Sequence, residues 1–257
     1  GEAQASGFAE ADPTLDIEGL DTAHKLAILS ALAFGMEINL KDIYTEGISQ
    51  ITPLDIEFAG QFGYRIKLLA ISKHKGESIE ARVHPTMIPF DNMLSNVNAI
   101  LNAVTICADA VEDIMLYGRG AGMMPTASAV LGDLADIGRN LMTGATGRVP
   151  LLSYQMKNIR TVAVLPISEI VTHYYLRFSA LDRPGVLSKI SGILGKNHIS
   201  IKSAYQKGRK SNGSVPLVML THSAREADVI QALTEIESLE VVSKRPVLIR
   251  IEDENND

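Results

Sequence analysis

The chain has 257 residues, enough for one or two domains of ordinary size. Apolar residues make up 46% of it and charged residues 21%, a balance that supports a sizeable core and excludes wholesale disorder. The formal net charge is −6, from 24 Lys and Arg against 30 Asp and Glu, and no basic tract occurs. These features argue against nucleic acid as the main partner.

The chain shows no sign of export. Its single cysteine, Cys107, excludes an internal disulfide and fits a reducing cytoplasm. No apolar run reaches the roughly 20 residues that span a bilayer, so no membrane is expected. Residues 1–4 lack the basic and apolar parts of a secretory signal. Because the sequence does not begin with Met, we expect it to be a trimmed piece of a longer protein.

The first strong helix signal begins at Asp21, a favourable N-cap, and Gly35 is expected to end this helix. Residues 64–71 and 78–83 are apolar or alternating and flank a short turn at 75–77, which predicts a hairpin.

The next segments complete a helix–sheet domain. The apolar run 99–107 predicts a central strand with Cys107 in the core, and residues 113–117 predict a further strand. A glycine-rich turn at 118–122 precedes a helix expected over 126–141. Residues 1–141 are therefore expected to form one domain with mixed or antiparallel strands.

Residues 142–170 are irregular and are interpreted as a connector. From residue 171 the order returns as strand, helix, strand, strand, helix, strand, over 174–180, 186–194, 199–205, 215–220, 224–236 and 241–251. This is the split βαβ order of ferredoxin-like folds, so residues 171–257 are expected to form a second domain. The acidic tail 252–257 is expected to fray. The predicted fold class is α+β, a mixed sheet with helices packed on it followed by a ferredoxin-like βαββαβ domain.

The most unusual segment carries five carboxylates between Glu10 and Asp21 and then Lys25. Asp21 and Lys25 are four residues apart and share a helix face. Carboxylates suit the ammonium of an amino acid, and a nearby lysine suits proton exchange with an oxygen. The alternative is structural: Asp21 only caps the helix, and Lys25 only pairs with it on a solvated face.

Several separated motifs resemble the homoserine dehydrogenase family. They are Glu10-x-Asp12-Pro13…Asp16-x-x-Gly19-x-Asp21-x-x-x-Lys25, then His84-Pro85-x-x-Ile88-Pro89, Asn102-Ala103-Val104 and Gly120-Ala121-Gly122-Met123-Met124-Pro125. Tyr174-Tyr175-Leu176-Arg177 and Asp182-Arg183-Pro184-Gly185-Val186-Leu187 resemble the family's C-terminal ACT domain. The resemblance extends over nearly the whole chain.

The resemblance implies a dehydrogenase that interconverts aspartate semialdehyde and homoserine in amino-acid biosynthesis. Lys25 would exchange the proton at the substrate oxygen, with Asp16 lining the pocket and orienting the reacting groups. Glu10 and Asp21 would bind homoserine. Gly7 and Gly122 would lie where the backbone approaches the nicotinamide nucleotide, NADP or NAD, because glycine has no side chain to obstruct it.

The family's dinucleotide-binding domain is not found in this sequence, since no Gly-x-Gly-x-x-Gly follows a strand near its start. Residues 118–122 have the wrong spacing and are equally compatible with a simple turn. We therefore expect these residues alone to be inactive.

In the C-terminal domain the resemblance implies an effector site, with threonine as the effector. Pro184 and Gly185 shape a turn before the helix that begins at Val186, so backbone N–H groups are available for a carboxylate, and Asp182 suits an ammonium. The alternative is a plain strand-to-helix turn. A homo-oligomer, at least a dimer, is expected from the same resemblance.

Other chemistry finds little support in the sequence. The six histidines are scattered without paired metal spacing, so no metal site is expected. The second functional hypothesis is a non-catalytic amino-acid-binding regulator that has kept an old pocket.

Overall fold

The computed structural model describes residues 12–145, 147–150, 152–206, 208 and 213–253. We call residues 12–145 the N-terminal unit and residues 171–253 the C-terminal unit. The elements up to residue 143 are α2 (Thr14–Ile17), α3 (Leu20–Phe34), β1 (Met36–Glu37), β2 (Tyr44–Thr45), α4 (Pro53–Gln61), β3 (Tyr64–Lys75), β4 (Ser78–Pro89), β5 (Leu101–Ala108), β6 (Glu112–Arg119) and α5 (Met123–Thr143). The hairpin expected around 75–77 is confirmed as β3 and β4, which pair over their whole length.

The later elements follow the expected βαββαβ order. They are β7 (Arg160–Thr161), β8 (Ala163–Val164), β9 (Val171–Leu181), α6 (Val186–Lys196), β10 (Ile201–Gln206), β11 (Ser214–Thr221), β12 (Ala224–Arg225), α7 (Glu226–Glu237) and β13 (Val247–Ile251). The last strand begins later than predicted, because Val242 makes only an isolated bridge to Ala180. The segment between β10 and β11, residues 207–213, lies mostly outside the described residues.

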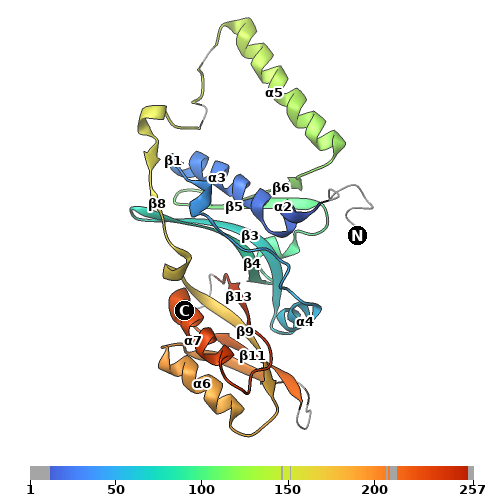
Figure 1. Cartoon of the computed structure of the whole chain (residues 1–257). Coiled ribbons are helices and arrows are strands. Elements are labelled where there is room, and N and C mark those ends of the chain that lie inside the picture. The colour runs from blue at the N-terminus through green and yellow to red at the C-terminus, as the bar shows by residue number, and fades with distance from the viewer. Residues whose placement is uncertain (1–11, 146, 151, 207, 209–212, 254–257) are drawn as a thin grey trace.

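One sheet joins the two units. Within the described residues nine strands form it, in the order β10-β11-β9-β13-β4-β2, with β3 and β8 also paired to β4 and β12 to β9. The antiparallel order β10-β11-β9-β13 is that of a ferredoxin-like sheet. β13 then pairs in parallel with β4, so the C-terminal sheet continues directly into the N-terminal unit (Figure 1).

Both faces of the C-terminal sheet are covered. Successive side chains of a strand point to opposite faces, and in β9 Tyr174, Leu176 and Phe178 pack against α6 and α7. Tyr175 points the other way and packs with Phe58 of α4. This arrangement explains why Tyr174 and Tyr175 are both fully buried although they are neighbours in the sequence.

In the N-terminal unit, α3 packs on β4. Ala23 and Leu26 meet Ile79, Ala81 and Val83. The alternate β4 positions, Glu80, Arg82, His84 and Thr86, form a buried polar stripe on the opposite face of the strand.

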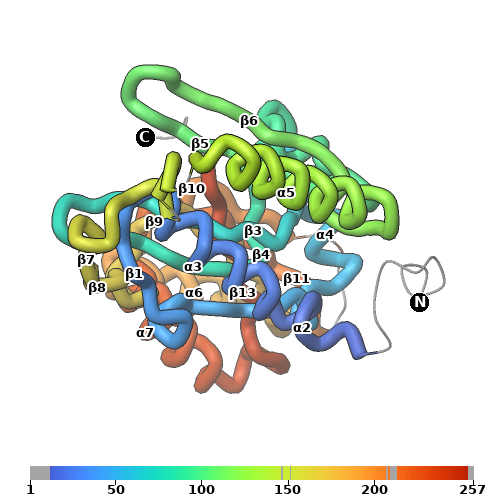
Figure 2. Tube along the Cα trace, turned by 90° about the horizontal axis from the view of Figure 1, so that it is seen from above, coloured from blue at the N-terminus to red at the C-terminus, as the bar shows by residue number. Residues whose placement is uncertain are grey.

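The β5–β6 hairpin and α5 differ from the rest of the chain. Within the part of the chain that the structure describes, β5 pairs only with β6, and α5 contains no buried residue. Figure 2 shows the hairpin projecting beyond the body of the molecule, and Figure 1 shows α5 standing apart above α3. The strand expected at 99–107 is confirmed as β5, but its expected central place in the sheet is wrong. Cys107 is exposed rather than in the core, because the described chain supplies no second layer over this apolar run.

Candidate functional site

A tight turn at Gly19 joins α2 to α3. Gly19 has φ +78°, in the left-handed region, and its carbonyl accepts the first helical hydrogen bond, from Ala23 N at 3.0 Å. The prediction that Asp21 caps this helix is wrong, because the helix already begins at Leu20 and Asp21 lies in its first turn. Gly35 ends the helix in a left-handed conformation, as predicted.

Asp21 and Lys25 form an ion pair on one face of α3. Lys25 Nζ donates to Asp21 Oδ2 at 2.6 Å. The lysine side chain is 64% exposed and the aspartate side chain 42%, so the pair stabilises the fold little and stays open to a small molecule. The arrangement places Lys25 Nζ and its carboxylate acceptor at the surface of the molecule.

The other predicted residues of this site are less constrained. Asp16 is exposed in α2, one turn before Gly19. Among the described residues, no hydrogen bond or ion pair joins its side chain to Asp21 or Lys25. Glu10 and Gly7 lie outside the described residues. Of the four predicted catalytic and substrate-binding residues, the structure therefore brings together Asp21 and Lys25.

The glycine-rich turn before α5 has a backbone that favours glycine. Gly122 has φ +122° and ψ 152°, and its carbonyl accepts the first bond of α5, from Thr126 N at 3.0 Å. At Gly120 an added Cβ would lie 2.4 Å from Nδ2 of the exposed Asn102, so that side chain would have to move. A bare backbone at the N-terminus of a long helix fits close approach of a phosphate-bearing nucleotide.

The predicted effector residues line one cavity of about 190 Å³ in the C-terminal unit. Asp182, Gly185 and Val186 form part of its wall, and Gln206 Nε2 lies 3.4 Å from Asp182 Oδ1. Gly185 has φ +85° and is the N-cap residue of α6. The cavity therefore combines a carboxylate, a carboxamide and a helix N-terminus with apolar walls that include Val215 and Leu217. Such a lining matches the charged and apolar parts of a small amino acid.

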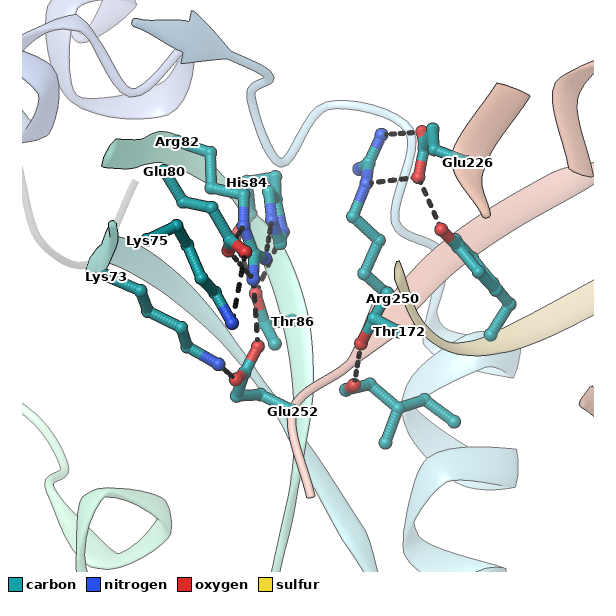
Figure 3. A network of polar contacts seen from close by, with 12 residues as sticks. Lys73, Lys75, Glu80, Arg82, His84, Thr86, Thr172, Glu226, Arg250 and Glu252 are labelled. Carbon is teal, nitrogen blue, oxygen red and sulfur yellow. Dashed lines mark hydrogen bonds and ion pairs between the residues drawn. The ribbon is translucent and has the colours of Figure 1, made fainter. Parts of the chain in front are cut away.

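A buried polar network missed by the sequence analysis lies between the units (Figure 3). Arg250 of β13 holds Glu226 of α7 through two hydrogen bonds, one of them 3.0 Å from Nε to Oε2. Its Nη1 donates to Glu46 Oε2 at 2.8 Å, and its guanidinium lies 5.0 Å from the centre of the Tyr44 ring. Tyr174 Oη donates to Glu226 at 2.9 Å.

The second half of the network lies on β4. Arg82 donates to Glu80 and Glu252, each at 3.1 Å, and Lys73 also pairs with Glu252. The expectation that the tail frays from residue 252 is therefore wrong at its first positions, where Glu252 is held and Asp253 accepts a hydrogen bond from Tyr64. The remaining residues, 254–257, lie outside the described part.

Charge and burial shift the pKa values within the network. Burial, followed by the charges of Arg250 and Arg82, holds the pKa of His84 well below its usual range. Burial, opposed by Arg250, raises the pKa of Tyr44 to about 12. Burial opposes the charge on Arg250, but Glu226 outweighs it and raises the Arg250 pKa. The sequence signal for this network was a single arginine inside the apolar run Val247–Ile251.

The described part of the chain contains no group of three or more His, Cys, Asp or Glu side chains placed to hold a metal ion. It also contains no helix with both the length and the apolarity needed to cross a membrane.

Comparison with known proteins identifies the family. The sequence profile of homoserine dehydrogenase matches residues 1–135, and that of the ACT domain matches residues 174–241. The chain belongs to the homoserine dehydrogenase family. It is 46% identical over 251 residues to a homoserine dehydrogenase of Neisseria gonorrhoeae and 45% identical over 255 residues to one of Pseudomonas aeruginosa. These matches cover 98% and 99% of this chain but 58% and 59% of the relatives.

Solved structures agree with this assignment. A homoserine dehydrogenase from Thiobacillus denitrificans superposes with a TM-score of 0.90 at 46% identity, covering 98% of this chain and 57% of that one. One from S. aureus superposes with a TM-score of 0.70 at 30% identity, covering 98% and 58%. The chain therefore spans less than three fifths of the length of these homoserine dehydrogenases, and it includes an ACT domain.

Proposed function

We propose that this chain is the substrate-binding and regulatory part of a homoserine dehydrogenase, which interconverts L-aspartate 4-semialdehyde and L-homoserine. The observation that carries the proposal is the Asp21–Lys25 pair, whose Nζ–Oδ2 distance is 2.6 Å, at the motif that resembles the family's substrate segment. When bound, NADP or NAD supplies hydride for reduction of the aldehyde or accepts it from homoserine.

The residues of this chain handle the proton and the position of the substrate. During oxidation of homoserine, Lys25 Nζ takes the hydroxyl proton as hydride leaves the carbon that bears the hydroxyl, and the steps reverse in reduction. Asp21 accepts a hydrogen bond from Lys25 and so orients it, and Asp21 and Glu10 attract the substrate ammonium. Asp16, exposed in α2 just before the turn, is proposed to orient the reacting groups. Gly122, with Gly7, allows the backbone to approach the nucleotide.

The C-terminal cavity is proposed as the effector site, with threonine as its ligand. Asp182 faces the effector ammonium, while the turn at Gly185 and Val186 offers backbone N–H groups to its carboxylate. The cavity of about 190 Å³ suits a small amino acid better than an aromatic one.

The chain is further proposed to act as a homo-oligomer, at least a dimer. Exposed apolar side chains gather on β5, β6 and α5, including Ile106, Leu116, Leu131 and Leu134. A monomer rarely leaves such contiguous apolar area uncovered.

The proposed function is tested by supplying the nucleotide-binding part. Oxidation of homoserine, followed by nucleotide absorbance, is expected from the longer polypeptide that joins a dinucleotide-binding domain to this chain. The 257 residues alone are expected to show no steady-state turnover. Turnover by this chain alone would contradict the division of labour, and an inactive longer polypeptide that binds nucleotide would contradict the proposed reaction.

A further inference from the structure

Strand β2 faces two different parts of the molecule. Tyr44 and Thr45 pair with Arg82 and Val83 of β4, and Glu46 N donates to Val83 O at 2.8 Å, so residues 44–46 run along the edge of the sheet. Side chains alternate along such a segment. Tyr44 and Glu46 point toward Arg250, whereas Thr45 points to the opposite face.

The Arg250 side of this strand is firmly held by the C-terminal unit. The side chains of Arg250 and Glu226 are each 3% exposed, and Tyr174 of the central strand β9 donates to the same Glu226 carboxylate. A buried guanidinium that loses a carboxylate leaves a costly unpaired charge, so Arg250 has little freedom to move. Its contact with Glu46 therefore fixes residues 44–46 relative to β9, β13 and α7.

The opposite side of the strand supports the turn between α2 and α3. A Cβ added at Gly19 would lie 3.1 Å from Val83 Cγ1 and 3.4 Å from Thr45 Cγ2. A Cβ added at Gly47 would lie within 2.7 Å of Glu18 and Ile17. Ile48 N donates to Ile17 O at 2.9 Å. Residues 45–48 are therefore packed directly beneath the turn at 17–19.

The candidate catalytic residues lie on both sides of that turn. Asp16 lies in α2, just before the turn, and Asp21 and Lys25 lie after it, in the first turns of α3. We propose that Arg250 is a positioning residue, which acts through Glu46 and β2 to set the placement of Asp16, Asp21 and Lys25. The inference rests on the proposed function of those three residues. It makes the C-terminal unit part of the support of the substrate site.

The kinetic test compares two charge-removing variants in the polypeptide that carries the nucleotide-binding domain. Glu46→Gln weakens the contact to Arg250, which keeps Glu226 and therefore stays paired. Asp55→Asn is the matched control, because Asp55 of α4 also binds an arginine of the C-terminal unit, Arg177 Nε at 2.6 Å, but has no contact with the 17–19 turn among those described.

The KM for homoserine is expected to rise in Glu46→Gln and further, about tenfold, in Glu46→Ala, equivalent to about 1.4 kcal/mol of binding. The KM for the nucleotide and the values for Asp55→Asn are expected to stay near those of the parent. Equal effects of Glu46→Gln and Asp55→Asn on the homoserine KM would overturn the inference, because both would then report general loosening between the units.

Hydrogen exchange on the 257-residue chain tests the same link without any activity. Faster exchange is expected at residues 17–23 in Glu46→Ala, with no change there in Asp55→Asn. Unchanged exchange in Glu46→Ala would overturn the positioning role. If the parent polypeptide does not oxidise homoserine, the proposed function fails, while the exchange result still decides whether Arg250 and Glu46 hold this turn.

Discussion

Apolar side chains are buried at one end of the molecule and exposed at the other. In the C-terminal unit both faces of the sheet are covered, by α6 and α7 on one side and by α4 on the other. At the opposite end, β5, β6 and α5 leave apolar side chains such as Leu116 and Leu134 more than half exposed. One end completes its core within the chain, whereas the other presents exposed apolar side chains, which we propose are covered by a second copy of the chain.

The contrast extends to the contacts that connect each part to the rest of the chain. Among the described residues the C-terminal unit is anchored to the N-terminal unit by three arginine–carboxylate contacts and by continuous strand pairing. The contacts are Arg177 with Asp55, Arg250 with Glu46 and Arg82 with Glu252. The ACT domain and the segment beneath the turn at 17–19 are therefore directly connected. The apolar end makes no such connection among the described residues, and we propose that it serves self-association.

Substitutions in the two ends should separate them most clearly in stability. Phe178→Ala removes a fully buried ring from the C-terminal core and is expected to cost about 3–5 kcal/mol of unfolding free energy. Leu116→Ala, at a side chain 61% exposed in this chain, is expected to cost less than about 0.5 kcal/mol in dilute protein. Urea denaturation at low concentration measures both. Similar losses would show that the hairpin is buried within the monomer after all.

The same surface should reveal itself in self-association. Leu116→Asp places a charge on the apolar hairpin and is expected to weaken dimerisation by at least about 2 kcal/mol, while the monomer stays folded. Light scattering over a concentration series measures this loss. If the parent chain is monomeric at every concentration, the proposed self-association through β5, β6 and α5 is contradicted.

Sequence patterns predicted the elements better than their partners. The βαββαβ order could be predicted because alternation, Pro184-Gly185 and helical spacing are local signals. The pairing of β13 with β4 could not be predicted, because the backbone donors and acceptors of a strand are the same whichever strand lies beside it. The apolar run 99–107 predicts a buried strand. Apolarity alone does not say whether the segment that covers such a strand comes from the same chain, so the exposure of β5 could not be predicted.

The candidate site was predictable to a similar degree. Spacing placed Asp21 and Lys25 on one face, and the structure brings them to 2.6 Å. The assignment of Asp21 as the cap failed because Gly19, with its positive φ, starts the helix earlier. Arg250 was missed because its partners, Glu226 and Glu46, come from distant segments and only the folded sheet brings them together.

His84, in the polar stripe of β4, should have a smaller, pH-dependent effect on the free energy of unfolding. The folded-state pKa of His84 lies below its unfolded value near 6.5, since burial and the charges of Arg250 and Arg82 oppose protonation. Neutral His84 contributes fully to the free energy of unfolding above that pH. The contribution is lost as the pH falls, because the unfolded chain then binds a proton at His84 that the folded chain does not bind.

Denaturation between pH 7.5 and 5.5 measures this contribution. Below about pH 6.5 the parent is expected to lose about 1 kcal/mol per pH unit more than His84→Gln, which has no titrating ring. The Gln amide oxygen still accepts from Arg82, whose Nη1 lies 2.8 Å from His84 Nε2. Parallel pH curves for the two proteins would show that His84 is protonated in the fold.

Only a small change in stability is expected for the pair on α3. Lys25 and Asp21 are too exposed to contribute more than about 1 kcal/mol, so Lys25→Ala should unfold almost as the parent does. The effect of this substitution is expected in turnover instead, which separates a catalytic role from a structural one.

The most direct measurement is therefore the kcat of Lys25→Ala for homoserine, in the polypeptide that carries the nucleotide-binding domain, beside Lys41→Ala at another exposed lysine. If Lys25 exchanges the hydroxyl proton, its kcat falls by at least about 100-fold with a modest change in KM, while Lys41→Ala keeps the parent value. Turnover of Lys25→Ala near that of the parent would contradict the account.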